Sequence, residues 1–289
     1  MATDPSRVFD DLSRVRNLVR ALDFKVVMRR VLKRVPGLSY LTRSYFDAVD
    51  YPQYAYGVLL ACLQAKALGF ARTTVIEFGV AGGNGLLAMG TAGREIGGAL
   101  GLAVDVVGFD TGAGLPPSAD LRDLPYWYGH GDYRMDVDAL KRRLGDCELV
   151  LGDIAETLPR FLDSFGDRGP IGFCSVDVDY YSSTRSALDV LVGVPHTRLP
   201  RVLCYFDDIQ VGDLAYVTPR TGQLAAIHAF NAAKPGGELA KVDAVRHNRP
   251  IEAPWNDVIY VYQDFAHPLF DRHMEFGDRQ IALAGEGGA

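Results

Sequence analysis

Short apolar runs alternate with helical segments from residue 73 onward, and this alternation constrains the fold more than any other feature. Five runs have the composition of buried strands, at 73–78, 104–109, 147–151, 171–176 and 201–206. Helical patterns lie between them at 85–97, 136–144, 154–165 and 183–192. Because strands joined through helices form right-handed crossovers, the pattern predicts an α/β fold with a parallel sheet covered on both faces. Two later runs, at 240–245 and 257–263, are expected to complete the sheet.

The chain before residue 73 has a helical rather than a strand pattern. Residues 6–35 place apolar and basic side chains at helical spacing until Pro36-Gly37, and a second helical run covers 54–68. We therefore expect an N-terminal helical cap or extension over residues 1–70, followed by a catalytic α/β domain over residues 71–289.

The N-terminal segment is basic although the chain as a whole is acidic. Residues 1–34 hold nine Lys and Arg against four Asp, whereas the net charge of the whole chain is −6. A basic amphipathic helix is able to lie on a membrane. The acidic remainder favours instead a cap over the site or a contact between subunits, so we expect a homo-oligomer and no membrane partner.

Composition excludes several classes of protein. A sequence pI of about 5.5 excludes a nucleic-acid partner recognised by bulk charge. No apolar run reaches the roughly 20 residues of a membrane span, and the N-terminus lacks a signal-peptide pattern. The cysteines have neither metal nor redox spacing and are expected in the core of a cytoplasmic protein: Cys62, Cys147, Cys174 and Cys204.

A glycine-rich turn follows the first predicted strand, in "EFGVAGGNG". Its spacing is not G-x-G-x-x-G, which disfavours a nicotinamide cofactor. Glu77 precedes the first glycine by two residues, and the next two predicted strands end at Asp110 and Asp153. Acids at three successive strand ends suit a cationic ligand better than a pyrophosphate. The glycines alone are equally consistent with a tight turn that binds nothing.

Four further carboxylates follow the fourth and fifth predicted strands: Asp177, Asp179, Asp207 and Asp208. Carboxylates brought together at neighbouring strand ends raise one another's pKa unless a cation or proton intervenes. Oxygen ligands suit Mg²⁺, and the absence of a Cys/His cluster in the sequence argues against zinc. The alternative is that one or two of these acids cap the following helices, as Asp179 would ahead of "YYSSTRSAL".

Four phrases together resemble the class I S-adenosylmethionine-dependent methyltransferases, and most of all the macrocin O-methyltransferase branch: "VIEFGVAGGNG", "VVGFDTGAGLP", "ELVLGDIAETLPRFL" and "DVDYYSSTRSAL". The resemblance covers about residues 73–265. It implies a Rossmann-like sheet of order 3-2-1-4-5-7-6 with the last strand antiparallel. It also implies cofactor contacts for the methionine part, the ribose and the adenine, from Glu77, Gly79, Gly83, Asp110, Asp153 and Ile154. Thr111-Gly112-Ala113 stands where the family often has a bulky residue, beside the expected ribose.

The same resemblance implies roles for the second group of acids. Asp177, Asp207 and Asp208 become Mg²⁺ ligands, with Asp177 also bordering the cofactor. Asp179 becomes the general base that takes the acceptor's proton, although Tyr180 stands where some relatives have a histidine.

The expected function is therefore a Mg²⁺-assisted O-methyltransferase that uses S-adenosyl-L-methionine. Its acceptor is expected to be a small-molecule hydroxyl, on a sugar or in natural product biosynthesis. The aromatic stretch 124–136 is expected to overhang the cofactor edge of the sheet, where it could stack on a sugar or aromatic acceptor, and Arg220 and Gln223 are expected to contribute lid contacts. Two alternatives remain open at this point. One is a nucleotide-sugar glycosyltransferase that uses Asp177 and Asp179 as an Asp-x-Asp metal motif, and the other is a non-catalytic cofactor-binding protein.

Overall fold

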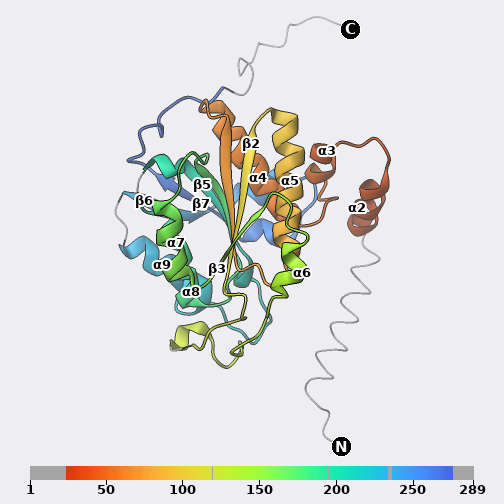
Figure 1. The fold of residues 1–289 in the computed structure, drawn as a ribbon. Helices are drawn as coiled ribbons and strands as arrows, with labels where there is room; N and C mark the ends of the chain where they lie inside the picture. The colour runs from red at the N-terminus through yellow and green to blue at the C-terminus, as the bar shows by residue number, and fades with distance from the viewer. Residues whose placement is uncertain (1–23, 119, 194, 234–235, 276–289) are drawn as a thin grey trace, which may run out of the picture.

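A computed structural model describes residues 24–118, 120–193, 195–233 and 236–275 of the chain, and it shows a sheet flanked by helices (Figure 1). The sheet has seven strands: β1 Arg72–Phe78, β2 Ala103–Asp110, β3 Glu148–Leu151, β4 Ile171–Val176, β5 Arg198–Phe206, β6 Gly237–Lys241 and β7 Ile259–Asp264. The described helices of five or more residues are α2 Phe24–Arg34, α3 Tyr40–Tyr45, α4 Pro52–Ala67, α5 Asn84–Leu100, α6 Val137–Lys141, α7 Ile154–Asp163, α8 Tyr181–Leu188, α9 Gly222–Ala233 and α10 Ala244–Asn248.

The strand order is β3-β2-β1-β4-β5-β7-β6. Strands β1 to β5 pair in parallel, whereas β7 runs antiparallel between β5 and β6. The predicted fold class, order and antiparallel last strand are confirmed. This order places β1 beside β4 although the strands β2 and β3 lie between them along the chain, so the carboxyl ends of β1, β4 and β5 adjoin one another. Ligands of open α/β sheets bind at such a point of reversed strand order.

Helices cover both faces of the sheet, which explains why its central strands are apolar throughout. Helices α4 and α5 lie on one face, and α7, α8 and α9 lie on the other (Figure 1). Every residue of β4 is buried: Phe173 packs with the first layer and Cys174 with the second. The four cysteines are buried and unbridged, as the sequence predicted.

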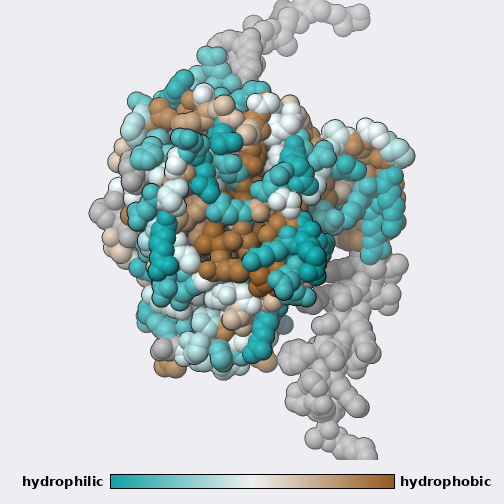
Figure 2. All heavy atoms as spheres, in the orientation of Figure 1, coloured by the Kyte–Doolittle hydropathy of each residue, from teal (hydrophilic) through white to brown (hydrophobic). Residues whose placement is uncertain are grey.

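Strand β3 forms one edge of the sheet. The face shown in Figure 2 exposes hydrophobic side chains near its middle, in the region of β3, where Leu151 is 37% exposed. The opposite edge corrects one expectation, because β6 ends at Lys241 and residues 244–248 form α10 rather than a strand. Strand β6 takes its register from pairing with β7, in which Leu239 faces Tyr262, and this long-range pairing overrides the local apolar pattern at 240–245.

The segment predicted as an N-terminal extension contains helices of two kinds. Helix α4 belongs to the core, where Tyr54 and Val58 are buried beside Phe173. Helix α2 has no buried residue and is joined to the body by ion pairs from Arg29 to Asp47 and from Lys33 to Asp50. The first 23 residues of the basic segment lie outside the described residues, and the division at residue 70 stays a prediction. Among the described helices, none combines the length and apolar character needed to cross a membrane.

Candidate active site

A cavity of about 480 Å³ opens at the carboxyl edge of the sheet, where β1, β2, β4 and β5 end. Nine of the ten residues predicted for the site line it: Glu77, Gly79, Gly83, Asp110, Ile154, Asp177, Asp179, Asp207 and Asp208. The tenth, Asp153, lines a neighbouring cavity together with Ile154. Its carboxylate accepts a hydrogen bond from the Ala155 N–H at 2.8 Å and so caps α7, while Ile154 lines the larger cavity.

The glycine turn has its shape because the strand ends approach one another closely. Gly79 has φ +85°, and a Cβ on it would lie 1.6 Å from the carbonyl oxygen of Asp177. A Cβ on Gly85 would lie 2.1 Å from Glu77 Oε1. Any side chain at these two positions would therefore push the first acid and the fourth strand out of the site.

Glu77 is a buried carboxylate with one free oxygen. Its exposed fraction is 2%, and its Oε1 accepts a hydrogen bond of 2.7 Å from the hydroxyl of Tyr54. Its Oε2 is buried and has no hydrogen-bond partner among the described residues. Burial raises the pKa of Glu77 well above its ordinary value, and Asp177 and Asp110 raise it further, whereas Tyr54 opposes the shift. A cationic ligand group at Oε2 would satisfy this oxygen and restore the ionised form.

Asp110 holds the glycine turn in place, a role that the sequence did not indicate. Its Oδ2 accepts the N–H groups of Val80 and Ala81, each at 2.8 Å, and its Oδ1 accepts the N–H of Gly112 at 2.6 Å. Each carboxylate oxygen accepts about two hydrogen bonds, so one position on Oδ1 is left for a ligand hydroxyl. The second-strand acid thus both builds the turn and faces the cavity.

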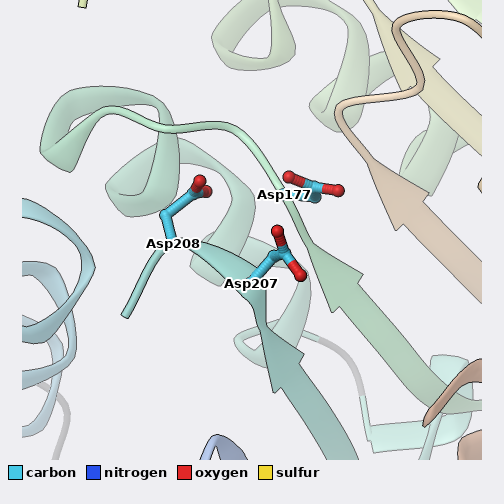
Figure 3. A group of neighbouring side chains, drawn as sticks. All are labelled: Asp177, Asp207 and Asp208. Carbon is cyan, nitrogen blue, oxygen red and sulfur yellow. The ribbon is translucent and has the colours of Figure 1, made fainter. Parts of the chain in front are cut away.

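The second group of acids meets at the ends of β4 and β5. One carboxylate oxygen from each of Asp177, Asp207 and Asp208 lies within 4.8 Å of the others, and the three side chains rise from two adjacent strand ends (Figure 3). The pKa of Asp208 lies well above its ordinary value because of burial, with Asp179, Asp177 and Asp207 adding to the shift. Burial followed by repulsion from Asp207 and Asp179 raises that of Asp177. A bound divalent cation would remove the repulsion that causes these shifts.

Asp179 stands beside this cluster in a strained backbone conformation. Its φ is +61°, and its N–H donates to Asp208 Oδ2 at 2.8 Å. Burial raises the pKa of Asp179 to about 6, against the lowering effect of Asp208 and Tyr128. Non-glycine residues with such a φ persist only where surrounding contacts hold them, often at functional sites.

The alternative in which Asp179 caps the following helix is wrong. The residue that precedes α8 is Tyr180, and no side chain of its own caps the helix. The buried carboxylate of Asp123 instead accepts hydrogen bonds from the N–H of Ser182 at 2.8 Å and from its hydroxyl at 3.0 Å. Because Asp123 lies 59 residues earlier in the chain, no local motif signals this cap.

Aromatic side chains form another part of the cavity wall. Trp127, Tyr128 and Tyr133 line the cavity from the loop that follows β2. Gly212, from the loop after β5, packs so closely that a Cβ on it would lie 2.6 Å from Trp127. The Tyr128 side chain is 6% exposed, and its hydroxyl has no hydrogen bond of standard geometry in the described structure. Its pKa is raised by burial, Asp208 and Asp179, so Tyr128 remains a hydrogen-bond donor.

The structure adds one residue to the cavity wall and corrects the expectation of lid contacts from Arg220 and Gln223. Tyr51, which the sequence did not single out, lines the cavity at the start of α4 and has φ +50°. Gln223 is fully buried rather than placed in a lid, and Arg220 is exposed and does not line the cavity.

No protein-family model matches the sequence, and a search of the curated proteins gives no match. Among solved structures, CalS11, a calicheamicin methyltransferase, is 18% identical, with 91% of this chain and 94% of that chain covered and a TM-score of 0.50. The chain has a methyltransferase fold. The apo structure of CalS11, described as a TDP-rhamnose 3'-O-methyltransferase, is 16% identical over 91% and 96% of the two chains, with a TM-score of 0.45.

Proposed function

We propose that this protein is an S-adenosylmethionine-dependent O-methyltransferase that uses Mg²⁺ to methylate a hydroxyl of a small molecule, a sugar or a natural product. One observation carries the proposal. A glycine turn with two acids and a separate carboxylate cluster face the same cavity from neighbouring strand ends. The first arrangement suits a cationic nucleoside, and the second suits a divalent cation with a hydroxyl ligand.

The residues around the glycine turn fit the cofactor. Glu77 Oε2, buried and unpartnered among the described residues, suits the ammonium group of the methionine part. Asp110 keeps one acceptor position for a ribose hydroxyl, and Ile154 supplies an apolar surface for adenine. Asp153 supports this surface by capping α7 rather than by lining the cavity itself.

The carboxylate cluster fits a hard divalent cation. Asp177, Asp207 and Asp208 offer three oxygens within reach of one ion, which leaves coordination positions for the acceptor and water. The Asp208 Oδ2 already accepts the Asp179 N–H, which orients this carboxylate while leaving it acceptor positions for a cation. This donor set contains only oxygens. Mg²⁺ prefers oxygen ligands, whereas zinc sites usually include His nitrogen or Cys sulfur.

The chain's own residues then orient the acceptor and move its proton. When bound, S-adenosylmethionine supplies an electrophilic methyl group, and Mg²⁺ supplies positive charge that lowers the pKa of the acceptor hydroxyl. Asp179 accepts the proton of that hydroxyl, a role for which a pKa of about 6 is well matched near neutral pH. Glu77 and Asp110 fix the cofactor at the other end of the cavity, so that much of the rate enhancement comes from alignment.

The aromatic wall favours an acceptor with both an apolar face and hydroxyl groups. Trp127 and Tyr133 offer ring surface, and Tyr128 offers a hydroxyl donor on the same side as Asp179. A sugar ring, with its C–H face and its hydroxyls, presents both kinds of group. The names of CalS11 describe a sugar O-methyltransferase of calicheamicin biosynthesis, which agrees with this choice.

Calorimetric titration tests the proposal and separates it from the alternatives. We expect binding of S-adenosylmethionine and S-adenosylhomocysteine with or without Mg²⁺, and no Mg²⁺-dependent binding of a nucleotide diphosphate as donor. Binding of neither adenosyl compound would reject the methyltransferase. Metal-dependent binding of UDP-sugars alone would favour the glycosyltransferase instead.

A further inference from the structure

The side chain of Gln223 contacts the backbone beside the carboxylate cluster. Gln223 is the second residue of α9, and its side chain is 0% exposed. A buried amide is costly unless its donor and acceptor groups are satisfied. The partners of this amide therefore show what the side chain holds together.

Both ends of the Gln223 amide bond to the backbone next to the acids. Its Nε2 donates to the carbonyl oxygen of Val176 at 3.0 Å, and its Oε1 accepts the N–H of Asp208 at 3.0 Å. Val176 is the last residue of β4 and immediately precedes Asp177, while Asp208 follows the end of β5. A single side chain thus joins the two strand ends that carry the cluster.

A third bond links the same two segments on the cavity side. The N–H of Asp179 donates to Asp208 Oδ2 at 2.8 Å and holds Asp179 at its positive φ. Asp208 is therefore held at two points: its N–H donates to Gln223, and one of its carboxylate oxygens accepts the N–H of Asp179. Its backbone and side chain are both fixed before any ligand binds.

Parallel pairing alone does not fix the acids in this way. The last pair of β4 and β5 in register is Val176 with Phe206, so the acids lie just beyond the ladder. At this point the strands diverge into α8 and into the 3₁₀ turn Asp207–Ile209. Beyond this last pair, the Gln223 amide links the two strands again, through Val176 on one side and Asp208 on the other.

The same helix provides a matched comparison. Asn231 of α9 also bridges backbone groups with its amide, since its Nδ2 donates to Leu239 O at 2.9 Å and its Oδ1 accepts the Leu239 N–H at 3.0 Å. This second bridge anchors α9 to β6, at the far edge of the sheet. The two amides thus make the same number of bonds, but only Gln223 touches the segments that carry the acids.

We propose that Gln223 is a positioning residue that sets the separation of Asp177 from Asp207 and Asp208, and so preassembles the cluster for a divalent cation. The inference rests on the proposed function for the identity of the cation, Mg²⁺, but the bridging itself is a feature of the protein alone. A preassembled set of ligands binds its ion more tightly because the ordering is already complete when the ion arrives.

The test compares Gln223→Met with Asn231→Leu in the full-length protein. Each variant replaces an amide, fully buried at Gln223 and partly buried at Asn231, with an apolar side chain of similar size and removes two hydrogen bonds. We expect Gln223→Met to lower Mg²⁺ affinity, measured by calorimetry, by about tenfold or more. S-Adenosylhomocysteine affinity is expected to stay within about twofold. Asn231→Leu is expected to lower the melting temperature while leaving Mg²⁺ affinity unchanged.

A second readout needs no metal. Amide hydrogen exchange of the metal-free protein should show lost protection at the Asp208 N–H in Gln223→Met and retained protection there in Asn231→Leu. If Gln223→Met does not fold, Gln223→Asn replaces it, because its amide is one methylene too short to span both partners and should lower Mg²⁺ affinity in the same way.

The outcomes separate this inference from the proposed function. Equal Mg²⁺ affinity in wild type and in the Gln223 variant overturns the positioning role and leaves the methyltransferase standing. An equal loss of Mg²⁺ affinity in both helix α9 variants also overturns it, because the effect would then be general destabilisation. A wild-type protein that binds S-adenosylhomocysteine but no Mg²⁺ overturns the metal site and the inference together.

Discussion

The hydroxyl of Tyr54 donates a hydrogen bond of 2.7 Å to Glu77 Oε1, and both side chains are buried. Helix α4 thereby contributes directly to the end of the cavity where we propose that the methionine part binds. The bond occupies one carboxylate oxygen and leaves the other, Oε2, buried and without a partner among the described residues of a side chain that lines the cavity.

Neutralising Glu77 should weaken cofactor binding. Glu77→Gln removes the charge that would pair with the ligand's ammonium group, and we expect S-adenosylhomocysteine to bind about 1.5–3 kcal/mol more weakly by calorimetry. Tyr54→Phe is the matched control, since it keeps the carboxylate and removes only the orienting bond; its expected cost is about 1 kcal/mol. Wild-type affinity in Glu77→Gln would contradict the proposed ammonium contact.

Replacing Asp110 should affect both the turn and the ligand. Asp110→Ala removes the acceptor of the Val80 and Ala81 N–H groups as well as the proposed ribose contact. We expect it to weaken S-adenosylhomocysteine binding by about 1.5–3 kcal/mol and to lower the melting temperature. Asp136→Ala serves as a comparison, because it removes a helix cap worth about 1 kcal/mol at a residue that does not line the cavity and should leave affinity nearly unchanged. Unaltered binding in Asp110→Ala would exclude the ribose role.

Removing the metal should separate binding from turnover. With EDTA, S-adenosylhomocysteine affinity is expected to persist while methyl transfer to a hydroxyl acceptor is lost, because Glu77 and Asp110, which we propose hold the cofactor, are not among the proposed ligands of the cation. Asp207→Asn should behave like EDTA treatment. Asp179→Asn should still bind Mg²⁺ but turn over about 10²–10⁴-fold more slowly, the range expected for a lost general base. Turnover that resists EDTA would show that the cluster has another purpose.

Mg²⁺ affinity should rise with pH. The pKa of Asp179 is raised to about 6, and burial and mutual repulsion hold those of Asp177 and Asp208 well above their ordinary values. Protons therefore compete with the cation, and calorimetry from about pH 5 to about pH 7.5 should show tighter binding and proton release. Since the folded metal-free protein binds more protons than the unfolded chain, its stability should fall over this interval. A pH-independent Mg²⁺ affinity would argue that the carboxylates are already ionised.

Tyr128 should act on the acceptor and not on the cofactor. Tyr128→Phe keeps the ring that packs edge-on against Tyr180 and removes only the buried hydroxyl. We expect a higher KM for a sugar acceptor, by about three- to tenfold, because one hydrogen bond to the acceptor is lost. S-Adenosylhomocysteine affinity should not change. An unaltered KM would place the acceptor elsewhere in the cavity.

The sequence by itself determined the first five strands and most of the residues of the candidate site, but not the helix α10. Strand and helix periodicity are local properties, so the positions of β1 to β5 follow from runs such as 73–78 and 171–176. The acids at the strand ends were equally visible, because parallel strands bring their carboxyl ends to one edge, and Asp177, Asp207 and Asp208 do meet there.

Only the tertiary structure decided which groups hold these acids. Asp110 bonds to the glycine turn, Asp123 caps α8 across 59 residues, and Gln223 reaches Val176 across 47 residues. Side-chain bonds of this kind depend on distances between segments that are far apart in the chain, and they leave no periodicity in the sequence. The location of the acids is therefore encoded locally, whereas their orientation, burial and pKa arise from long-range packing.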